Sequence, residues 1–288
     1  MDSTPTLAII GGSGLYNMPG LGDVTAHEID TPFGKPSAPI IIGKLGERQI
    51  AFLARHGIGH HLSPSEVNYC ANIYALKSLG VERVVSISAC GSLREDYVPG
   101  DLVIPDQLFD LTRDRRRSFF REGLVAHIGV ADPFCPDLSQ QVFQAVKATG
   151  VTVHLGGSFI TVEGPRFSTK AESNVYRAWG MSVIGMTTSP EAFLAREAEL
   201  CYCVMAHVTD YDVWHLEQEP VSVEAVITVL THNTQIAQQA ITNLAQSLHP
   251  ERHCECGSAL ANAIITQPEH IPPETRQKLD LLIRKYIK

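Results

Sequence analysis

Short apolar runs recur along the chain and alternate with segments of helical spacing. The runs are rich in β-branched residues and bounded by glycine, proline or polar residues, which is typical of buried strands. Seven segments have this character: residues 6–12, 48–57, 81–92, 100–108, 151–165, 181–188 and 198–210. We therefore predict that each contains strand structure.

Apolar residues at intervals of three and four predict helices between these strands. Residues 63–80 have Pro64 near the start and Gly80 at the end, and residues 138–150 repeat this pattern. Residues 221–248 predict a long amphipathic helix. Its apolar face comprises Val223, Val226, Ile227, Leu230, Ala237, Ile241, Leu244 and Leu248.

The alternation of strands and helices predicts an α/β fold with a mostly parallel sheet covered on both faces. The chain has no internal repeat and no low-complexity linker, so we expect a single domain over residues 1–288. Residues 250–273, rich in Cys, His and Pro, are expected to form a peripheral segment before a C-terminal helix.

Charge and cysteine content narrow the function classes. A net charge of −8 argues against nucleic acid and anionic membranes as partners, because both require a concentrated basic surface. The basic run at residues 112–123 is more typical of a solvated loop or an ion-pair face than of a binding site. Seven cysteines without a secretory signal are typical of a reducing cytoplasm.

Anion donors follow four of the predicted strands. Where strands end in an open α/β sheet, glycines and hydroxyls allow backbone amides to approach an anion, and arginine can bind it with two hydrogen bonds. The donors are Ser13 within a glycine turn, Arg55 and His56, Ser88 and Ala89 beside Gly91, and Thr187 with Thr188. Two alternatives to anion binding remain. The glycine turn could be required only by chain geometry, and Arg55 could pair with an acid in the core.

Two aspartates one residue apart, Asp210 and Asp212, close the last predicted strand. A poorly solvated carboxyl pair has at least one raised pKa, so one member can donate a proton while the other accepts a hydrogen bond. Helix capping is the alternative. A metal site is not expected, because the neighbouring residues are aromatic and apolar.

Several motifs together are similar to a known family. They are "IIGGSGLY", "DTPFGKPS", "LARHG", "SACGSLRE", "PGDLVIPDQ", "TVEGPRFSTKAES", "GMTTSPEAFLAREAELCY" and "TDYDVW". Over residues 7–248 the chain resembles the trimeric purine nucleoside phosphorylase family, and within it the 5′-methylthioadenosine phosphorylases. The resemblance implies a mixed central sheet, a homotrimer, and cleavage of 5′-methylthioadenosine by inorganic phosphate as co-substrate, without a cofactor, in purine and methionine salvage.

The matching motifs also imply roles for individual residues. Phosphate is assigned to Ser13, Arg55, His56, Ser88, Ala89 and Thr187. The nucleoside is assigned to Phe167, Ser168, Met186, Asp210 and Asp212, with Val223 and Val226 as an apolar wall around the methylthio group. Asp210 is the candidate acid for N7 of the purine, and His127 is expected to reach the site of a neighbouring subunit.

The pattern departs from the resemblance at Gly185, where methylthioadenosine phosphorylases often carry asparagine. A smaller residue leaves room near the base, which keeps a broader purine nucleoside phosphorylase acting on adenosine or inosine as the alternative. Val223 favours a thioether over a 5′-hydroxyl.

Cys254 and Cys256, with His249 and His253, have the composition of a metal site, but their spacing fits no common zinc pattern. We therefore expect no metal. Some heat-stable relatives carry a similar cysteine-x-cysteine together with disulfides, which implies possible pairing with Cys135, Cys201 or Cys203.

Overall fold

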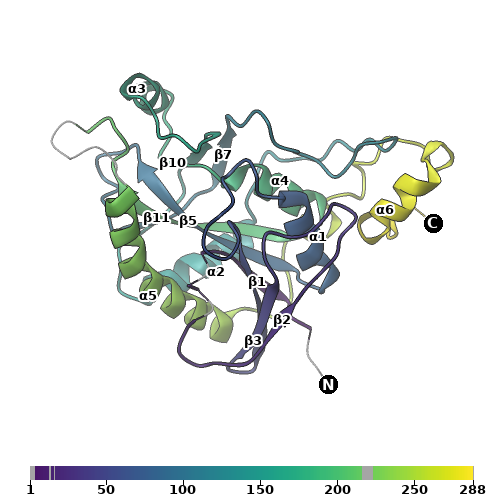
Figure 1. Ribbon diagram of the computed structural model, residues 1–288, viewed down its shortest axis with the longest axis horizontal. Coiled ribbons are helices and arrows are strands. Elements are labelled where there is room, and N and C mark those ends of the chain that lie inside the picture. Colours follow the sequence, from purple (N-terminus) through teal and green to yellow (C-terminus); the bar gives the residue numbers. More distant parts are fainter. Residues whose placement is uncertain (1–3, 13, 16, 216–222, 288) are drawn as a thin grey trace.

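The computed structural model describes residues 4–12, 14–15, 17–215 and 223–287, with the backbone alone over 223–232 (Figure 1). The strands are β1 (Leu7–Gly11), β2 (Leu21–His27), β3 (Ile40–Leu45), β4 (Arg48–Ala54), β5 (Arg83–Ser92), β6 (Leu102–Ile104), β7 (Gln107–Asp110), β8 (Val153–Leu155), β9 (Ser158–Thr161), β10 (Val183–Gly185) and β11 (Cys201–Asp210). The helices are α1 (Tyr69–Ser78), α2 (Pro136–Lys147), α3 (Lys170–Ala178), α4 (Thr188–Glu197), α5 (Val223–Ser247) and α6 (Pro273–Ile283), with 3₁₀ turns η1 (Glu255–Ser258) and η2 (Pro268–His270).

The strands form one mixed sheet in the order β2-β3-β4-β1-β5-β10-β9-β7, with β11 pairing β5 and β6, and β6 pairing β8. At its centre β4, β1, β5 and β11 are parallel, while the pairs β2–β3, β3–β4, β5–β10 and β6–β11 are antiparallel. The prediction of a mixed, mostly parallel sheet is confirmed. Because the central strands share one direction, the residues after β1 and β4 meet the ends of β5 and β11 at one edge.

Helices cover both faces of the sheet, as predicted (Figure 1). Side chains of a strand alternate between faces, and in β1 Leu7 and Ile9 enter one apolar cluster while Ala8 and Ile10 enter the other. The first cluster includes buried residues of α2 and α5, and the second includes those of α1, α4 and α6. The sheet is therefore buried on both sides, which explains the near-continuous apolar runs in its strands.

Several elements differ from the sequence-based prediction. The hairpin of β2 and β3 was not predicted, because β2 is largely exposed and lacks an apolar run. Residues 100–108 and 151–165 each contain parts of two strands; in the second, Gly156 and Gly157 separate them with positive φ. Helix α1 begins five residues after Pro64, where the Asn68 side chain accepts a hydrogen bond from the Ala71 N–H at 3.1 Å.

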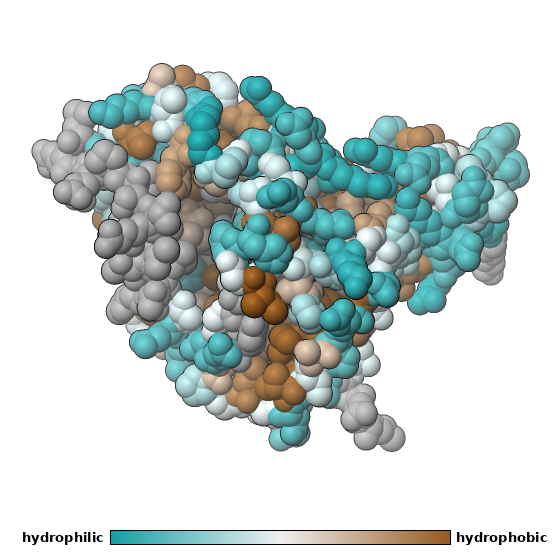
Figure 2. All heavy atoms as spheres, in the orientation of Figure 1, coloured by the Kyte–Doolittle hydropathy of each residue, from teal (hydrophilic) through white to brown (hydrophobic). Residues whose placement is uncertain are grey.

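The surface in Figure 2 is mostly hydrophilic, and hydrophobic residues gather in its middle and lower part, over the region of β1 and β3. Among the described residues, no helix has the length and apolar character to cross a bilayer.

Candidate functional site

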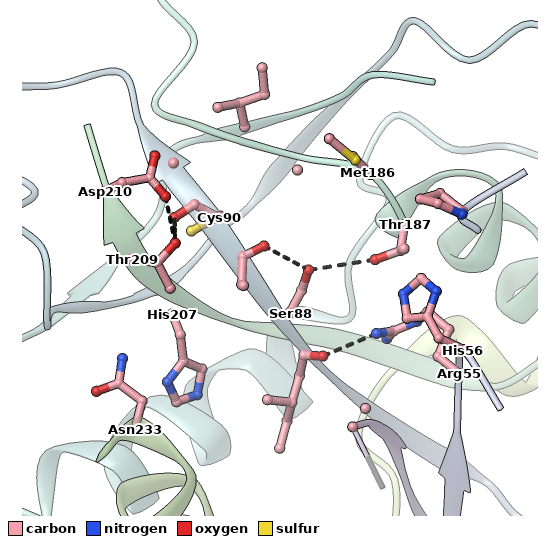
Figure 3. Close-up of a pocket in the computed structure, with 18 of the residues that line it drawn as sticks. Arg55, His56, Ser88, Cys90, Met186, Thr187, His207, Thr209, Asp210 and Asn233 are labelled. Atoms are coloured by element: carbon pink, nitrogen blue, oxygen red, sulfur yellow. Dashed lines mark hydrogen bonds between the residues drawn. The ribbon is translucent and has the colours of Figure 1, made fainter. Parts of the chain in front are cut away.

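A cavity of about 340 Å³ opens at the edge where the central strands end. Ten residues assigned from the sequence contribute to its wall: Arg55, His56, Ser88, Ala89, Phe167, Ser168, Met186, Thr187, Asp210 and Asp212. Ser13 lies outside the described residues, as do the side chains of Val223 and Val226, whose backbone belongs to the first turns of α5. Segments far apart in the chain thus converge on one cavity (Figure 3).

Arg55 follows β4 and is almost completely buried. Its Nε and Nη2 donate to the two carboxylate oxygens of Glu191 at 2.9 and 3.0 Å. Nη2 also donates to Ser86 Oγ at 2.6 Å, and Nη1 donates to the Ile87 carbonyl at 3.1 Å. Glu191 is thus the core acid that the sequence analysis gave as an alternative partner of Arg55. Of the five guanidinium hydrogens, these contacts use four and leave one on Nη1 for a ligand.

His56 is neutral at pH 7 in this setting. Burial, and then the positive charge of Arg55, lower the pKa of His56 to about 4. Its Nδ1 lies 2.8 Å from the Leu62 carbonyl, and since a carbonyl only accepts, Nδ1 carries the proton. Nε2 is then an acceptor, so the donor role suggested by the sequence requires protonation of the ring.

The residues before α4 supply hydroxyls to the cavity wall. Thr187 directly precedes this element, and its side chain makes no capping bond. Ser189 has non-helical φ and ψ of −101° and 134°, so regular helix begins only after it. Thr187 Oγ1 lies 3.5 Å from Ser88 Oγ, and both side chains are buried in the cavity wall. Two adjacent hydroxyls can donate hydrogen bonds to an oxyanion.

Arg115, within the basic run of residues 112–123, positions this wall. Its Nη1 donates to the carbonyls of Met186 at 2.6 Å and Ser189 at 2.8 Å. Its Nε and Nη2 donate to the side chain and carbonyl of Glu163 at 3.1 and 2.6 Å. The side chain is buried, so this part of the run makes internal hydrogen bonds and is not a solvated loop. Sequence analysis did not single out Arg115, because a run of arginines does not show which member turns inward.

Asp210 lies in another part of the cavity wall, away from Arg55 and Thr187 (Figure 3), and Asp212 also lines the cavity. Burial raises the pKa of both carboxyls, and the charge of Asp212 adds to the shift at Asp210. Asp210 accepts hydrogen bonds from Thr209 Oγ1 at 2.6 Å and from the Asp212 N–H at 2.7 Å. These contacts fix the orientation of a carboxyl that binds a proton more readily than an exposed aspartate.

Gly91 makes the approach of the two acids possible. A Cβ at this position would lie 2.9 Å from Asp210 Oδ1 and 3.2 Å from the Asp212 Cβ. The close backbone approach expected from the small residues of 88–91 therefore occurs, and at Gly91 it serves the carboxyl pair.

Gly185 does not leave the room that the sequence suggested. A Cβ at position 185 would lie 2.6 Å from the Phe159 ring, which fills the space behind the glycine. Phe159 is fully buried. The direction in which a side chain at position 185 would extend is thus occupied by Phe159.

Two buried polar residues in the cavity wall, His207 and Asn233, were not assigned by the sequence analysis. Neither ring nitrogen of His207, nor the amide of Asn233, hydrogen-bonds another residue that the structure describes. Both side chains are about 1% exposed. Burial alone lowers the pKa of His207 to about 4, so the ring is neutral at pH 7.

Three other residues lie apart from the cavity. His127 is exposed and absent from the cavity wall of its own chain, and its backbone N–H donates to the Ala263 carbonyl at 2.8 Å. Glu163 pairs with Arg115, whereas Arg166 pairs with Glu172 at 2.7 Å on the surface.

His207 should make stability fall with acid. Its pKa is about 4 when folded and 6.5 when unfolded, so the unfolded chain binds the proton first and stability is lost as pH falls from 6.5 towards 4. By pH 5 this amounts to about 2 kcal/mol. Denaturant unfolding at pH 7 and pH 5 should show a loss that is smaller by about this amount in His207→Met than in the parent, because His56, whose pKa is also lowered to about 4, contributes to the loss in both proteins. Equal losses in both proteins would contradict it.

Comparisons with known proteins agree with this geometry. Residues 6–246 match the model of the family described as Phosphorylase superfamily. The chain is 53% identical over 282 residues to S-methyl-5′-thioadenosine phosphorylase of Geobacter sulfurreducens, covering 98% of this chain and 99% of the relative. It is 51% identical over 280 residues to the protein of the same name from Koribacter versatilis, covering 97% and 96%.

Solved structures give the same result. A methylthioadenosine phosphorylase from an antarctic soil metagenomic library superposes with a TM-score of 0.93 at 44% identity, covering 97% of this chain and 99% of that one. An adenosine/methylthioadenosine phosphorylase mutant from Schistosoma mansoni, in complex with adenine, gives 0.83 at 36% identity, covering 90% and 96%. With this fold, this cavity and these relatives, the chain belongs to the phosphorylase superfamily.

Proposed function

We propose that the chain cleaves 5′-methylthioadenosine with inorganic phosphate, yielding adenine and 5-methylthioribose 1-phosphate. The names of its relatives support this substrate. The observation that carries the proposal is the division of the cavity wall into two parts: the Asp210 carboxyl lies on one side, and the anion donors Arg55 and Thr187 lie on the other, with the Ser88 hydroxyl nearer the middle (Figure 3). Asp212 lines the same cavity.

The carboxyl pair suits a departing 6-aminopurine. The base accumulates negative charge as its bond to the sugar breaks, and a proton or a strong hydrogen bond at N7 stabilises it. Asp210, whose pKa is raised by burial, serves as the donor. Asp212 holds the pocket and accepts from the 6-amino group. A 6-oxopurine would place a carbonyl against this acceptor, which supports adenine over hypoxanthine.

The anion donors suit phosphate. The free N–H of Arg55 and the hydroxyls of Ser88 and Thr187 bind its oxygens. The acceptor Nε2 of neutral His56 takes a hydrogen bond from a phosphate hydroxyl. The phosphate charge then stabilises the sugar cation that forms as the base departs, and a phosphate oxygen bonds to C1′.

We extend the proposal to the assembly and the location of the protein. We place His127 at an interface of a homotrimer, where it reaches a neighbouring cavity. Its neighbours Val125 and Ile265 support this, because they are apolar, 48% and 60% exposed, and joined by a hydrogen bond from the Ile265 N–H to the Val125 carbonyl at 2.9 Å.

Seven cysteines in the chain support a reducing cytoplasm as its location.

A substrate panel tests the reaction. Purified protein should release adenine from 5′-methylthioadenosine only when phosphate is present, faster than from adenosine, and should turn over inosine least. Base release without phosphate would indicate a hydrolase, and equal use of all three substrates would indicate a broad nucleoside phosphorylase. No release in either condition would indicate a binding protein.

Replacing the acid should affect chemistry more than phosphate binding. Asp210→Ala removes the proton donor at the base, so kcat for methylthioadenosine should fall by about 10²-fold or more, while the KM for phosphate changes little. Steady-state kinetics measure both constants. Asp280→Ala, at an exposed position of α6, is the control. Unchanged kcat in Asp210→Ala would remove Asp210 from this role.

Gly91→Ala should lower kcat with the Asp210 carboxyl still present. The added methyl group would meet Asp210 Oδ1 and turn the carboxyl away from the base. Gly22→Ala is the matched control, because a Cβ there meets nothing within 4 Å and the residue lies in an exposed edge strand. If the two variants retained equal activity, the carboxyl orientation would not depend on Gly91.

A further inference from the structure

Four cysteines from three distant segments come together outside the cavity. They are Cys135 before α2, Cys201 at the start of β11, and Cys254 and Cys256 at η1. Their four sulfur atoms all lie within 4.8 Å of one another, and those of Cys201 and Cys254 are 3.3 Å apart. Three of the four side chains are buried, and Cys254 is half-buried.

We propose that this cluster is a structural metal site that binds one zinc ion through four thiolates. Zinc with four cysteine ligands is tetrahedral with Zn–S bonds of about 2.3 Å, which places the sulfurs about 3.8 Å apart. The cluster has this scale, and each sulfur has all three others within reach. A disulfide joins sulfurs in pairs and does not by itself require four to meet at one point.

The surroundings of the cluster suit thiolates. Four thiolates around Zn²⁺ carry a net charge of −2, and a buried charge of this size needs compensation. Arg196 Nη1 donates to Cys256 Sγ at 3.5 Å, and Arg252 lies beside Cys201 and Cys254. The Leu138 N–H, in the first turn of α2, donates to Cys135 Sγ at 3.5 Å. Donors of this kind orient metal-bound sulfur.

The site would join the C-terminal segment to the sheet. Residues 250–273 contain little regular structure beyond η1 and η2, and Cys254 and Cys256 would connect them to α2 and β11 through the ion. Cys201 is the first residue of β11 and Asp210 is the last. The metal thus lies at the other end of the strand from the carboxyl pair and has a structural role rather than a catalytic one.

Metal content tests the proposal on the whole protein. Protein purified without added metal or reductant should contain one zinc per chain by elemental analysis. After removal of the zinc, added Co²⁺ should give the intense visible absorption of a tetrahedral tetrathiolate site. Absence of zinc together with absence of this cobalt spectrum would overturn the proposal.

Thiol counting separates zinc from disulfides. Denaturation with a chelator and an alkylating reagent, without reductant, should modify all seven cysteines if the cluster holds zinc. If the four clustered cysteines form two disulfides, only the remaining three will be modified, which would overturn the proposal. This measurement uses the unmodified chain and does not depend on whether a variant folds.

Matched variants place the metal in the cluster. Cys256→Ser should weaken zinc binding by about 100-fold or more, because loss of an outer-shell partner alone costs 10–100-fold. Cys203→Ala, two residues from Cys201 on β11 and outside the cluster, should retain full zinc content. Retention of zinc by Cys256→Ser, or its loss from Cys203→Ala, would refute this assignment.

Discussion

The buried pair of Arg55 and Glu191 connects the parts from which the site is made. Through one guanidinium, the residue after β4 contacts the carbonyl of Ile87 and the hydroxyl of Ser86 in β5, and the acid in α4. Glu191 also accepts from Tyr202 OH in β11 at 2.8 Å. Removing either charged partner would leave the other buried and unpaired, at a cost of about 3–5 kcal/mol. The relative position of α4 and the strand ends therefore depends on this pair.

The same pair explains how Arg55 can be both structural and available to a ligand. Glu191 offsets its charge and fixes its plane, so the remaining N–H is available to a ligand without the entropy loss of ordering a free side chain. Arg115 orders the same wall from behind, where it donates to the carbonyls of Met186 and Ser189. Two buried arginines thus set the shape of a site whose hydroxyls and carboxyls contact the substrate in the proposed reaction.

Much of this arrangement could be predicted from the sequence, because buried parallel strands have long apolar runs and the site follows their ends. The sheet class is confirmed, and Arg55, Thr187 and Asp210 line one cavity. The β2 and β3 hairpin was missed because an exposed edge strand has no apolar run. The inward turn of Arg115 and the filling of the space at Gly185 by Phe159 depend on tertiary packing, which spacing along one chain does not encode. The resemblance implied that Cys254 and Cys256 approach Cys135 or Cys201, and the structure brings all four sulfur atoms together. No metal was expected, because the spacing of Cys254 and Cys256 alone did not include the two distant cysteines.

Trp214 follows the carboxyl pair by two residues and is fixed in place. Its Nε1 donates to the Ser92 carbonyl at 2.7 Å, and the Arg177 guanidinium lies 3.3 Å from the ring centroid. The ring packs against the cluster of Leu93, Ile160, Tyr176 and Ile184, and Ile184 also lines the cavity. The chain has one other tryptophan, Trp179, which is 53% exposed. A ligand that shifts Ile184 would therefore alter the surroundings of the Trp214 indole, so intrinsic fluorescence offers a label-free signal of binding.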